Sequence, residues 1–470
     1  MNAQEGRVRS DQIDPDRADT EYIVVDIGSA VSKAGLADRD FPAKLPTVLS
    51  KKYTFSPCGR PQLESLPFKE EDLVLTEAQI NYVFFEKPMS LIQKPVWLVN
   101  RGIVTDWDQM EIFWHHTFYN ELQVAPEEHP LVVTEPLLNP RANRERMVQT
   151  LFEVFNIPAI YIEHAAVLAL RASGQMTGCV LDIGDSGCDI VPICSGCTVP
   201  NAVESSFGAS GQELTRYMRA LLKKECGDPA DSLSDAAVRH IKETLTYIAP
   251  DFNKEMQSAA VAPKEYERHY SDSMDGSNIT ISTARFCCPE ALFCPRIISE
   301  IEEGGAKDAV EAASLERGIG EGLVTAINQC DENIRSDLFT RIVLSGGSTQ
   351  FEGIGERLRK DIRSFLGDRQ LIMAFLMAGH ARLGLGCCPA IRSVACNQTT
   401  SRSIASFVID QISIVALPNR QELPWIGGSM LALDTPIGEM PGTTMMGGTW
   451  ALMEVYDEHG PTYFGARSSS

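Results

Sequence analysis

Two stretches of this chain share one pattern: YIVVDIGSAVSKAG at residues 22–35 and GCVLDIGDSGCDIV at residues 178–191. Each begins with a short apolar run, continues with Asp-Ile-Gly and small residues, and ends in a second partly apolar run. This pattern predicts a strand, a tight turn and a second strand. Because it occurs twice, we expect two related half-domains.

The segments around these two hairpins show helical periodicity. In residues 106–122, Met110, Phe113, Trp114 and Phe118 fall near one face of a helix. The other predicted helices lie at 142–155, 209–225, 233–249 and 322–339, and a short strand is predicted at 130–136. Strands that alternate with helices favour an α/β architecture.

Charge and hydropathy exclude several classes of protein. The 470 residues include 63 acidic and 42 basic side chains, a net charge of −21 that argues against direct binding of nucleic acid. No stretch approaches the roughly 18 uncharged apolar residues that a membrane helix needs. Residues 1–19 carry charges where a signal peptide needs an apolar run, so we expect a solvated tail and an intracellular protein.

The thirteen cysteines predict free thiols, because their count is odd and their density is far below that of a disulfide-stapled domain. Cys194 and Cys197 form the CxxC pair of the chain, but a zinc site needs four converging ligands. A turn between two strands explains this pair better.

The two Asp-Ile-Gly turns suit a nucleoside triphosphate with Mg²⁺. Small residues let backbone N–H groups approach phosphates, and carboxylates can hold the water shell of a divalent cation. We expect Asp26 and Asp182 to face the metal from opposite sides, through waters. The first phosphate clip comprises Gly28, Ser29 and Ala30, with Lys33 close behind, and the second comprises Gly184, Asp185, Ser186 and Gly187.

A third turn supports the same hypothesis. IVLSGGSTQFEGI at 342–354 places Gly346 and Gly347 after a strand, where backbone passes close to a base or a phosphate. Lys242 and Glu243 lie on the predicted helix 233–249, and either form an exposed helix face or bind a ligand. A single Asp-x-Gly turn is more often a plain hairpin, but two copies with a Gly-Gly turn favour a nucleotide site. The sequence has no GxxxxGK[ST] P-loop, which excludes a Walker-type site.

The chain resembles the actin and actin-related protein family over most of residues 20–465. Long similar stretches are RGIVTDWDQMEIFWHHTFYNELQVAPEEHPLVVTEPLLNPRANRERM at 101–147, HIKETLTYIAPDF at 240–252, IVLSGGSTQFEGI at 342–354 and WIGGSMLA at 425–432. The resemblance implies an actin-like ATPase fold, with two lobes and four subdomains around a cleft for ATP or ADP with Mg²⁺ or Ca²⁺. The implied divisions are subdomain 1 at 20–47, 98–172 and 423–470, subdomain 2 at 48–97, subdomain 3 at 173–209 and 297–422, and subdomain 4 at 210–296.

The resemblance also assigns roles to single residues. The family's first clip corresponds to Asp26, Gly28, Ser29 and Lys33, and its second clip to Asp182, Gly184 and Asp185. Its ribose and base contacts correspond to Gly211, Lys242 and Glu243, and its adenine-side turn to Gly346, Gly347 and Phe351.

Departures from the family are informative. The family's glutamine before AVL is Ala165 here, and its histidine in the second clip is Asp189. Those family residues are thought to orient the attacking water, so the resemblance implies weak or absent hydrolysis, although Asp189 can still order a water. Glu163 and His164 are expected to point roughly 100° to 200° away around a helix and to be poor substitutes. Arg101 stands where actin has a histidine.

Filament and partner contacts are expected to differ from those of actin. Residues 48–97 do not resemble actin's subunit-gripping loop, an insertion is expected at about 366–405, and 434–448 is rich in Gly and Pro. The first hypothesis is therefore a cytoplasmic component of a cytoskeletal assembly, with other proteins and possible contact with actin, and with self-polymerisation in doubt. A nuclear subunit of a chromatin-remodelling complex and a polymerising ATPase are the alternatives.

Overall fold

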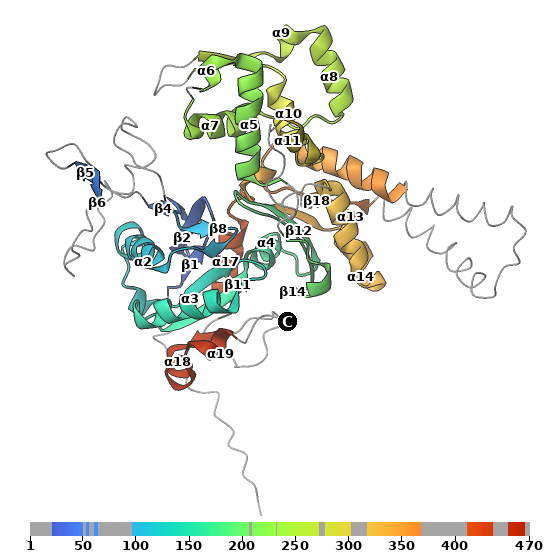
Figure 1. The fold of residues 1–470 in the computed structure, drawn as a ribbon. Helices are drawn as coiled ribbons and strands as arrows, with labels where there is room; N and C mark the ends of the chain where they lie inside the picture. The colour runs from blue at the N-terminus through green and yellow to red at the C-terminus, as the bar shows by residue number, and fades with distance from the viewer. Residues whose placement is uncertain are drawn as a thin grey trace, which may run out of the picture.

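The structure is a computed structural model that describes residues 21–49, 53–55, 61–63, 96–205, 209–231, 233–271, 278–301, 317–367, 411–435 and 450–465. Within these residues two larger sheets, each with its own helices, form two α/β lobes (Figure 1). The expected tail at 1–19 lies outside the described residues. So do most of segment 48–97, of the insertion at 366–405 and of the stretch at 434–448.

The first lobe is built on a six-stranded sheet with the order β19-β11-β10-β1-β2-β3. Strands β1 and β2 form the first predicted hairpin, in which Asp26 pairs with Lys33. Strands β10 and β11 run parallel to β1, so their carboxyl ends lie at the same edge of the sheet as Asp26. The strands are β1 (Ile23–Asp26), β2 (Val31–Leu36), β3 (Ala43–Pro46), β10 (Leu131–Glu135), β11 (Ala159–His164) and β19 (Ala451–Leu452).

Helices cover both faces of this sheet, and their apolar residues fall where the periodicity predicts. Helix α2 begins after Asp106, whose side chain accepts a hydrogen bond from the backbone N–H of Gln109, and it continues as a π-helix. The predicted apolar face of residues 106–122 is buried. The helical segments of this lobe are α2 (Trp107–His115), η3 (His116–Leu122), α3 (Arg141–Glu153), α4 (Ala165–Ala172), α17 (Leu423–Asp434), α18 (Met453–His459) and α19 (Pro461–Gly465).

The second lobe is built on a five-stranded sheet with the order β14-β13-β12-β17-β18. Strands β12 and β13 form the second predicted hairpin, in which Asp182 pairs with Asp189. The parallel strand β17 places Ser345 next to Asp182. The strands are β12 (Gly178–Ile183), β13 (Cys188–Cys194), β14 (Cys197–Thr198), β17 (Ile342–Ser345) and β18 (Ile414–Val415).

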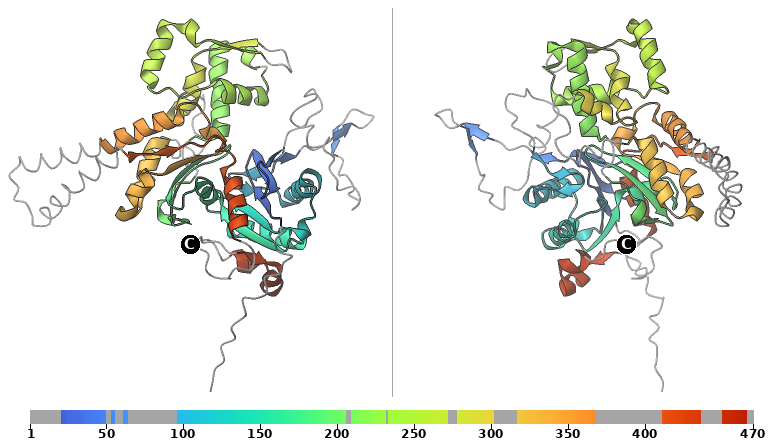
Figure 2. Two further views of the ribbon diagram at one scale, coloured as in Figure 1. Left: turned by 180° about the vertical axis from the view of Figure 1, so that it is seen from behind. Right: turned by 45° about the vertical axis from the view of Figure 1, so that its right-hand side comes forward.

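The helices of the second lobe agree with the predicted segments, with two differences. The expected helix 233–249 ends at Leu245, because the backbone is extended at Thr246. The expected helix 322–339 is two helices, because the backbone is extended at Cys330 and Asp331 then stands at the start of the next helix. The elements are α5 (Gly211–Cys226), α6 (Asp228–Asp231), α7 (Asp235–Leu245), α8 (Phe252–Val261), α9 (Pro263–Tyr266), β15 (Arg268–Ser271), β16 (Asn278–Ile281), α10 (Ala284–Glu290), α11 (Arg296–Ile301), α13 (Ile319–Gln329) and α14 (Glu332–Phe339). Both views in Figure 2 place the yellow-green helices of this lobe at the end of the molecule opposite α18 and α19.

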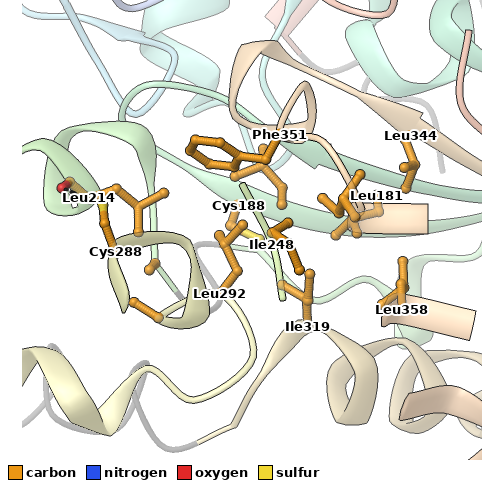
Figure 3. Close-up of a cluster of buried hydrophobic side chains, with 14 of the residues drawn as sticks. Leu181, Cys188, Leu214, Ile248, Cys288, Leu292, Ile319, Leu344, Phe351 and Leu358 are labelled. Carbon is orange, nitrogen blue, oxygen red and sulfur yellow. Dashed lines mark hydrogen bonds between the residues drawn. The ribbon is translucent and has the colours of Figure 1, made fainter. Parts of the chain in front are cut away.

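A large apolar core holds the second lobe together. Figure 3 shows Leu181 and Leu344 from the sheet facing Leu292, Ile319 and Leu358. All five side chains are buried, and each contributes roughly 1.5–3 kcal/mol of transfer free energy. This core fixes the strand ends from which the second clip and the Gly-Gly turn emerge.

The CxxC pair is a hairpin, as predicted. Cys194 and Cys197 are opposite each other across β13 and β14, and the two turn residues between them, Ser195 and Gly196, both have positive φ. The nine cysteines in the described part of the chain are free thiols. Across the same described ranges, no group of three or more metal-binding side chains occurs and no helix is long and apolar enough to cross a membrane.

Candidate nucleotide-binding cleft

A cavity of about 440 Å³ lies between the two predicted hairpins and the turn after β17. Every predicted contact residue except Gly211 lines it. The first lobe contributes Asp26, Gly28, Ser29, Ala30 and Lys33, and the second lobe contributes Asp182, Gly184, Asp185, Ser186, Gly187, Lys242, Glu243, Gly346, Gly347 and Phe351. The tertiary structure thus brings together residues that are more than three hundred positions apart in the chain.

Asp26 is fixed at the end of β1 by two neighbours. The Thr134 hydroxyl donates to one carboxylate oxygen at 3.0 Å, and the Lys33 ammonium donates to the other at 3.0 Å. Thr134 in turn accepts from the backbone N–H of Ile27 at 2.9 Å. Asp26 is buried, and these contacts hold its carboxylate at the wall of the cavity in one orientation.

Asp182 occupies the matching position at the end of β12. The pKa of the Asp182 carboxyl is raised to about 7, mainly by burial and in smaller part by the negative charges of Asp189 and Asp26, while Lys33 and the hydrogen bond with Ser345 oppose the rise. Asp26 and Lys33 belong to the other hairpin and line the same cavity as Asp182, so the two hairpin tips face one space. A divalent cation in that space would favour the ionised form of both aspartates.

The two clips touch each other through their serines. The Ser186 hydroxyl donates to the Ser29 hydroxyl oxygen at 2.6 Å. The backbone N–H of Arg101 donates to the Ser186 oxygen at 2.9 Å, and that of Gly102 donates to the Ser29 oxygen at 3.3 Å. A third backbone segment, the turn at 101–102, therefore lies against both clips.

The glycines of the site serve two different purposes. A Cβ atom at Gly28 would meet the Val31 carbonyl oxygen at 2.1 Å, and one at Gly346, where φ is +85°, would meet the Ile183 carbonyl oxygen at 2.4 Å. Those two glycines are required by the local packing. Gly347 is different, because a Cβ atom there would meet nothing within 4 Å. Its missing side chain leaves space in the cavity, as a binding site requires.

Lys242 and Gly211 lie behind the second clip. The buried Lys242 ammonium donates to the Gly211 carbonyl oxygen and to the Thr215 hydroxyl, both at 2.9 Å, and burial lowers the pKa of Lys242. The backbone N–H of Gly211 donates to the Gly184 carbonyl oxygen at 3.0 Å. Gly211 thus supports the clip from behind, while Lys242 and the adjacent Glu243 line the cavity.

Phe351 is mainly a core residue. Its side chain is 7% exposed, and Figure 3 shows its ring above Cys188 and Ile248. Only a small part of the ring is therefore available to a ligand in the cavity that it lines.

The two positions that depart from the family pattern both line the cavity. Ala165 is the first residue of α4 and has no polar side-chain atom. Asp189 accepts a hydrogen bond from the Ser205 hydroxyl at 2.8 Å and lies opposite Asp182 in the β12–β13 ladder.

The expectation that Glu163 and His164 turn away around a helix is wrong. Both are the last residues of strand β11, and α4 starts only at Ala165, because their extended backbone pairs with Thr134 and Glu135 of β10. Both side chains are buried, and neither is among the residues that line the cavity. Burial raises the pKa of Glu163 to about 7.

Several lining residues were not predicted from the sequence. Thr134 lies in the predicted strand 130–136, and its contact with Asp26 depends on strand pairing alone. Arg239 places a guanidinium nitrogen 3.6 Å from the Asp185 carboxylate and lies over the Trp97 ring, 5.8 Å from its centre. A signal for Arg239 was present, since it stands three residues before Lys242 on the same helix face.

Comparison with known protein families agrees with this geometry. A sequence model of the actin family matches residues 17–467, almost all of the 470 residues. The chain belongs to the actin family. As an actin-family protein it has the expected mixed α/β fold, and the family in general binds a nucleotide and a divalent cation. The residues present here fit such a ligand: two opposed aspartates, a lysine, serine hydroxyls and a glycine that faces open space all line one cavity.

Proposed function

We propose that this actin-family chain binds ATP or ADP with Mg²⁺ or Ca²⁺ as a structural ligand, and hydrolyses ATP weakly or not at all. We propose further that it is a component of a cytoplasmic, cytoskeletal assembly. The observation that carries the proposal is the cavity lined by both hairpin tips, in which the Asp26 charge contributes to the raised pKa of Asp182.

The donor set supports a polyphosphate with a metal ion. Ser29 and Ser186 offer hydroxyl groups from the two clips, and Lys33 offers a cation beside Asp26. A bound divalent cation would supply positive charge to the phosphates, and Asp26 and Asp182 would hold its water molecules. The raised pKa of Asp182 fits this role, because two carboxylates that face one space without a cation favour protonation of one of them.

Weak hydrolysis is proposed from the chemistry of two side chains. The Ala165 methyl group can neither donate nor accept a hydrogen bond, so it cannot orient a water molecule. The Asp189 carboxylate already accepts from Ser205 and adds a negative charge near the phosphates, which disfavours an approaching anionic nucleophile. If water positioning and proton transfer contribute roughly a hundred- to ten-thousand-fold in rate, their loss leaves a binder with slow turnover.

The assembly part of the proposal has a separate test. The net charge of −21 disfavours direct contact with nucleic acid and suits protein partners, with actin among the candidates. Affinity purification at native expression level followed by mass spectrometry identifies those partners. Tagged protein found only in the nucleus, or recovered with chromatin-remodelling subunits, would contradict the cytoskeletal part and leave nucleotide binding unaffected.

The nucleotide itself is tested directly. The protein is purified without added nucleotide, denatured, and the released small molecules are separated by ion-exchange chromatography. We expect close to one adenine nucleotide per chain. A chain that releases none, and that also fails to bind fluorescent ATP or ADP in the presence of Mg²⁺, refutes the proposed function.

A further inference from the structure

Arg101 occupies a two-residue turn that is anchored on both phosphate clips. The turn joins β8 (Val99–Asn100) to β9 (Ile103–Val104), and Arg101 and Gly102 have φ of +50° and +76°. An arginine in this left-handed region is strained, so the surroundings must hold it there. The backbone N–H groups of the two turn residues donate to Ser186 and Ser29, one serine from each clip.

The turn lies where the two clips converge. Since the Ser29 and Ser186 oxygens are 2.6 Å apart, the tips of both clips meet directly beneath it. The hydrogen bond between these two serines bridges the clips, so a linear polyphosphate held between the clips would end at this point. The exposed Arg101 side chain lines the cavity, and hydrogen bonds to both clips already fix its backbone at that end.

Arg101 differs from the other cations of the cavity. Five lysines and arginines line it. Lys33 pairs with Asp26, Lys44 pairs with Glu422, Arg239 pairs with Asp185, and Lys242 is held by Gly211 and Thr215. Over the described ranges, the Arg101 guanidinium makes no such ion pair or hydrogen bond.

We propose that Arg101 binds the terminal phosphate of a nucleoside triphosphate in this cleft and makes the site prefer ATP to ADP. The inference rests on the proposed function, because it assumes that the clips hold phosphates. The planar guanidinium presents several N–H donors that match two phosphate oxygens at once. In this arrangement a diphosphate, one phosphate shorter, would end before this position, and the same side chain would not contribute to its binding.

The test compares the affinities of wild type, Arg101→Gln and Arg101→Lys for fluorescent mant-ATP and mant-ADP, with Mg²⁺ present and bound nucleotide first removed. A hydrogen-bonded charge pair corresponds to roughly a tenfold to hundredfold change in Kd. We expect Arg101→Gln to weaken ATP binding by that factor and to change ADP binding less than twofold. The ATP affinity of Arg101→Lys should lie between those of wild type and Arg101→Gln, because an ammonium group keeps the charge but cannot match two phosphate oxygens at once.

A matched control separates a local effect from a change in net charge. Arg146→Gln removes the same charge from an exposed position on α3, and it should leave both affinities unchanged. Thermal melting of each variant checks that the fold is intact. Equal losses for ATP and ADP in Arg101→Gln, or no loss for either, overturn this inference and leave the proposed function intact. A wild-type chain that binds neither nucleotide overturns both.

Discussion

The buried carboxyl group of Glu163 makes the stability of this protein depend on pH in a way that one substitution can remove. Glu163 is 4% exposed at the end of β11. One oxygen accepts from the backbone N–H of His164 at 2.9 Å, and the other has no hydrogen-bond partner in the part of the chain that is described. Burial raises its pKa from 4.5 to about 7; the His164 N–H lowers it, Glu135 raises it and Arg144 lowers it.

The sign and size of the effect follow from this shift. The folded chain holds the Glu163 proton more tightly than the unfolded chain, so the unfolding free energy falls as the pH rises from about 4.5 to about 7. The shift corresponds to about 3 kcal/mol of lost stability once the group is ionised. Glutamine has the shape of the protonated side chain and cannot ionise. Glu163→Gln should therefore match the wild type near pH 4.5 and exceed it by up to about 3 kcal/mol above pH 7.

Thermal melting of both proteins at several pH values between 5 and 8 measures the effect. The gap in Tm should widen with pH and reach roughly 3 °C at pH 8. Groups distant from Glu163 that titrate in this range, such as Asp182, are present in both proteins and cancel in the difference. Glu356→Gln removes the same charge from an exposed site and should show no such widening. A constant gap between Glu163→Gln and wild type across this range would refute the reasoning.

Three further predictions concern the cleft. The double substitution of Ala165→Gln with Asp189→His should raise phosphate release from ATP by up to roughly a hundred- to ten-thousand-fold, and an unchanged rate would show that these positions do not limit hydrolysis. Gly346→Ala should lower Tm, because the new Cβ atom would meet a backbone oxygen at 2.4 Å. Gly347→Ala should leave Tm unchanged and weaken nucleotide binding, because its Cβ atom would enter open space in the cavity. If both variants changed Tm and nucleotide affinity equally, the two glycines would not have the different roles assigned to them. Chelating divalent cations with EDTA should speed the dissociation of fluorescent nucleotide, because Asp26 and Asp182 repel the phosphates when no cation lies between them. An unaltered dissociation rate would argue against the metal site.

Local sequence signals predicted the elements of the site because turn chemistry and side-chain periodicity act over a few residues. The Asp-Ile-Gly turns, the Gly-Gly turn and helix α7 all occur where the sequence indicates. Glu163 and His164 show the limit of this approach. They directly precede an apolar helical run, so the local sequence predicts that they belong to the helix. Pairing with β10 instead holds them in a strand.

Taken alone, the sequence determined the two hairpins, the α/β architecture, the likeness to the actin family and the identity of the residues at 165 and 189. The tertiary structure decided which side chains meet. Thr134 contacts Asp26 from 108 positions away, Ser186 contacts Ser29 from 157 positions away, and the Arg101 turn lies over both clips. Contacts of this kind depend on how sheets pair and how the lobes approach each other, and that packing is a property of the whole chain that no short pattern encodes.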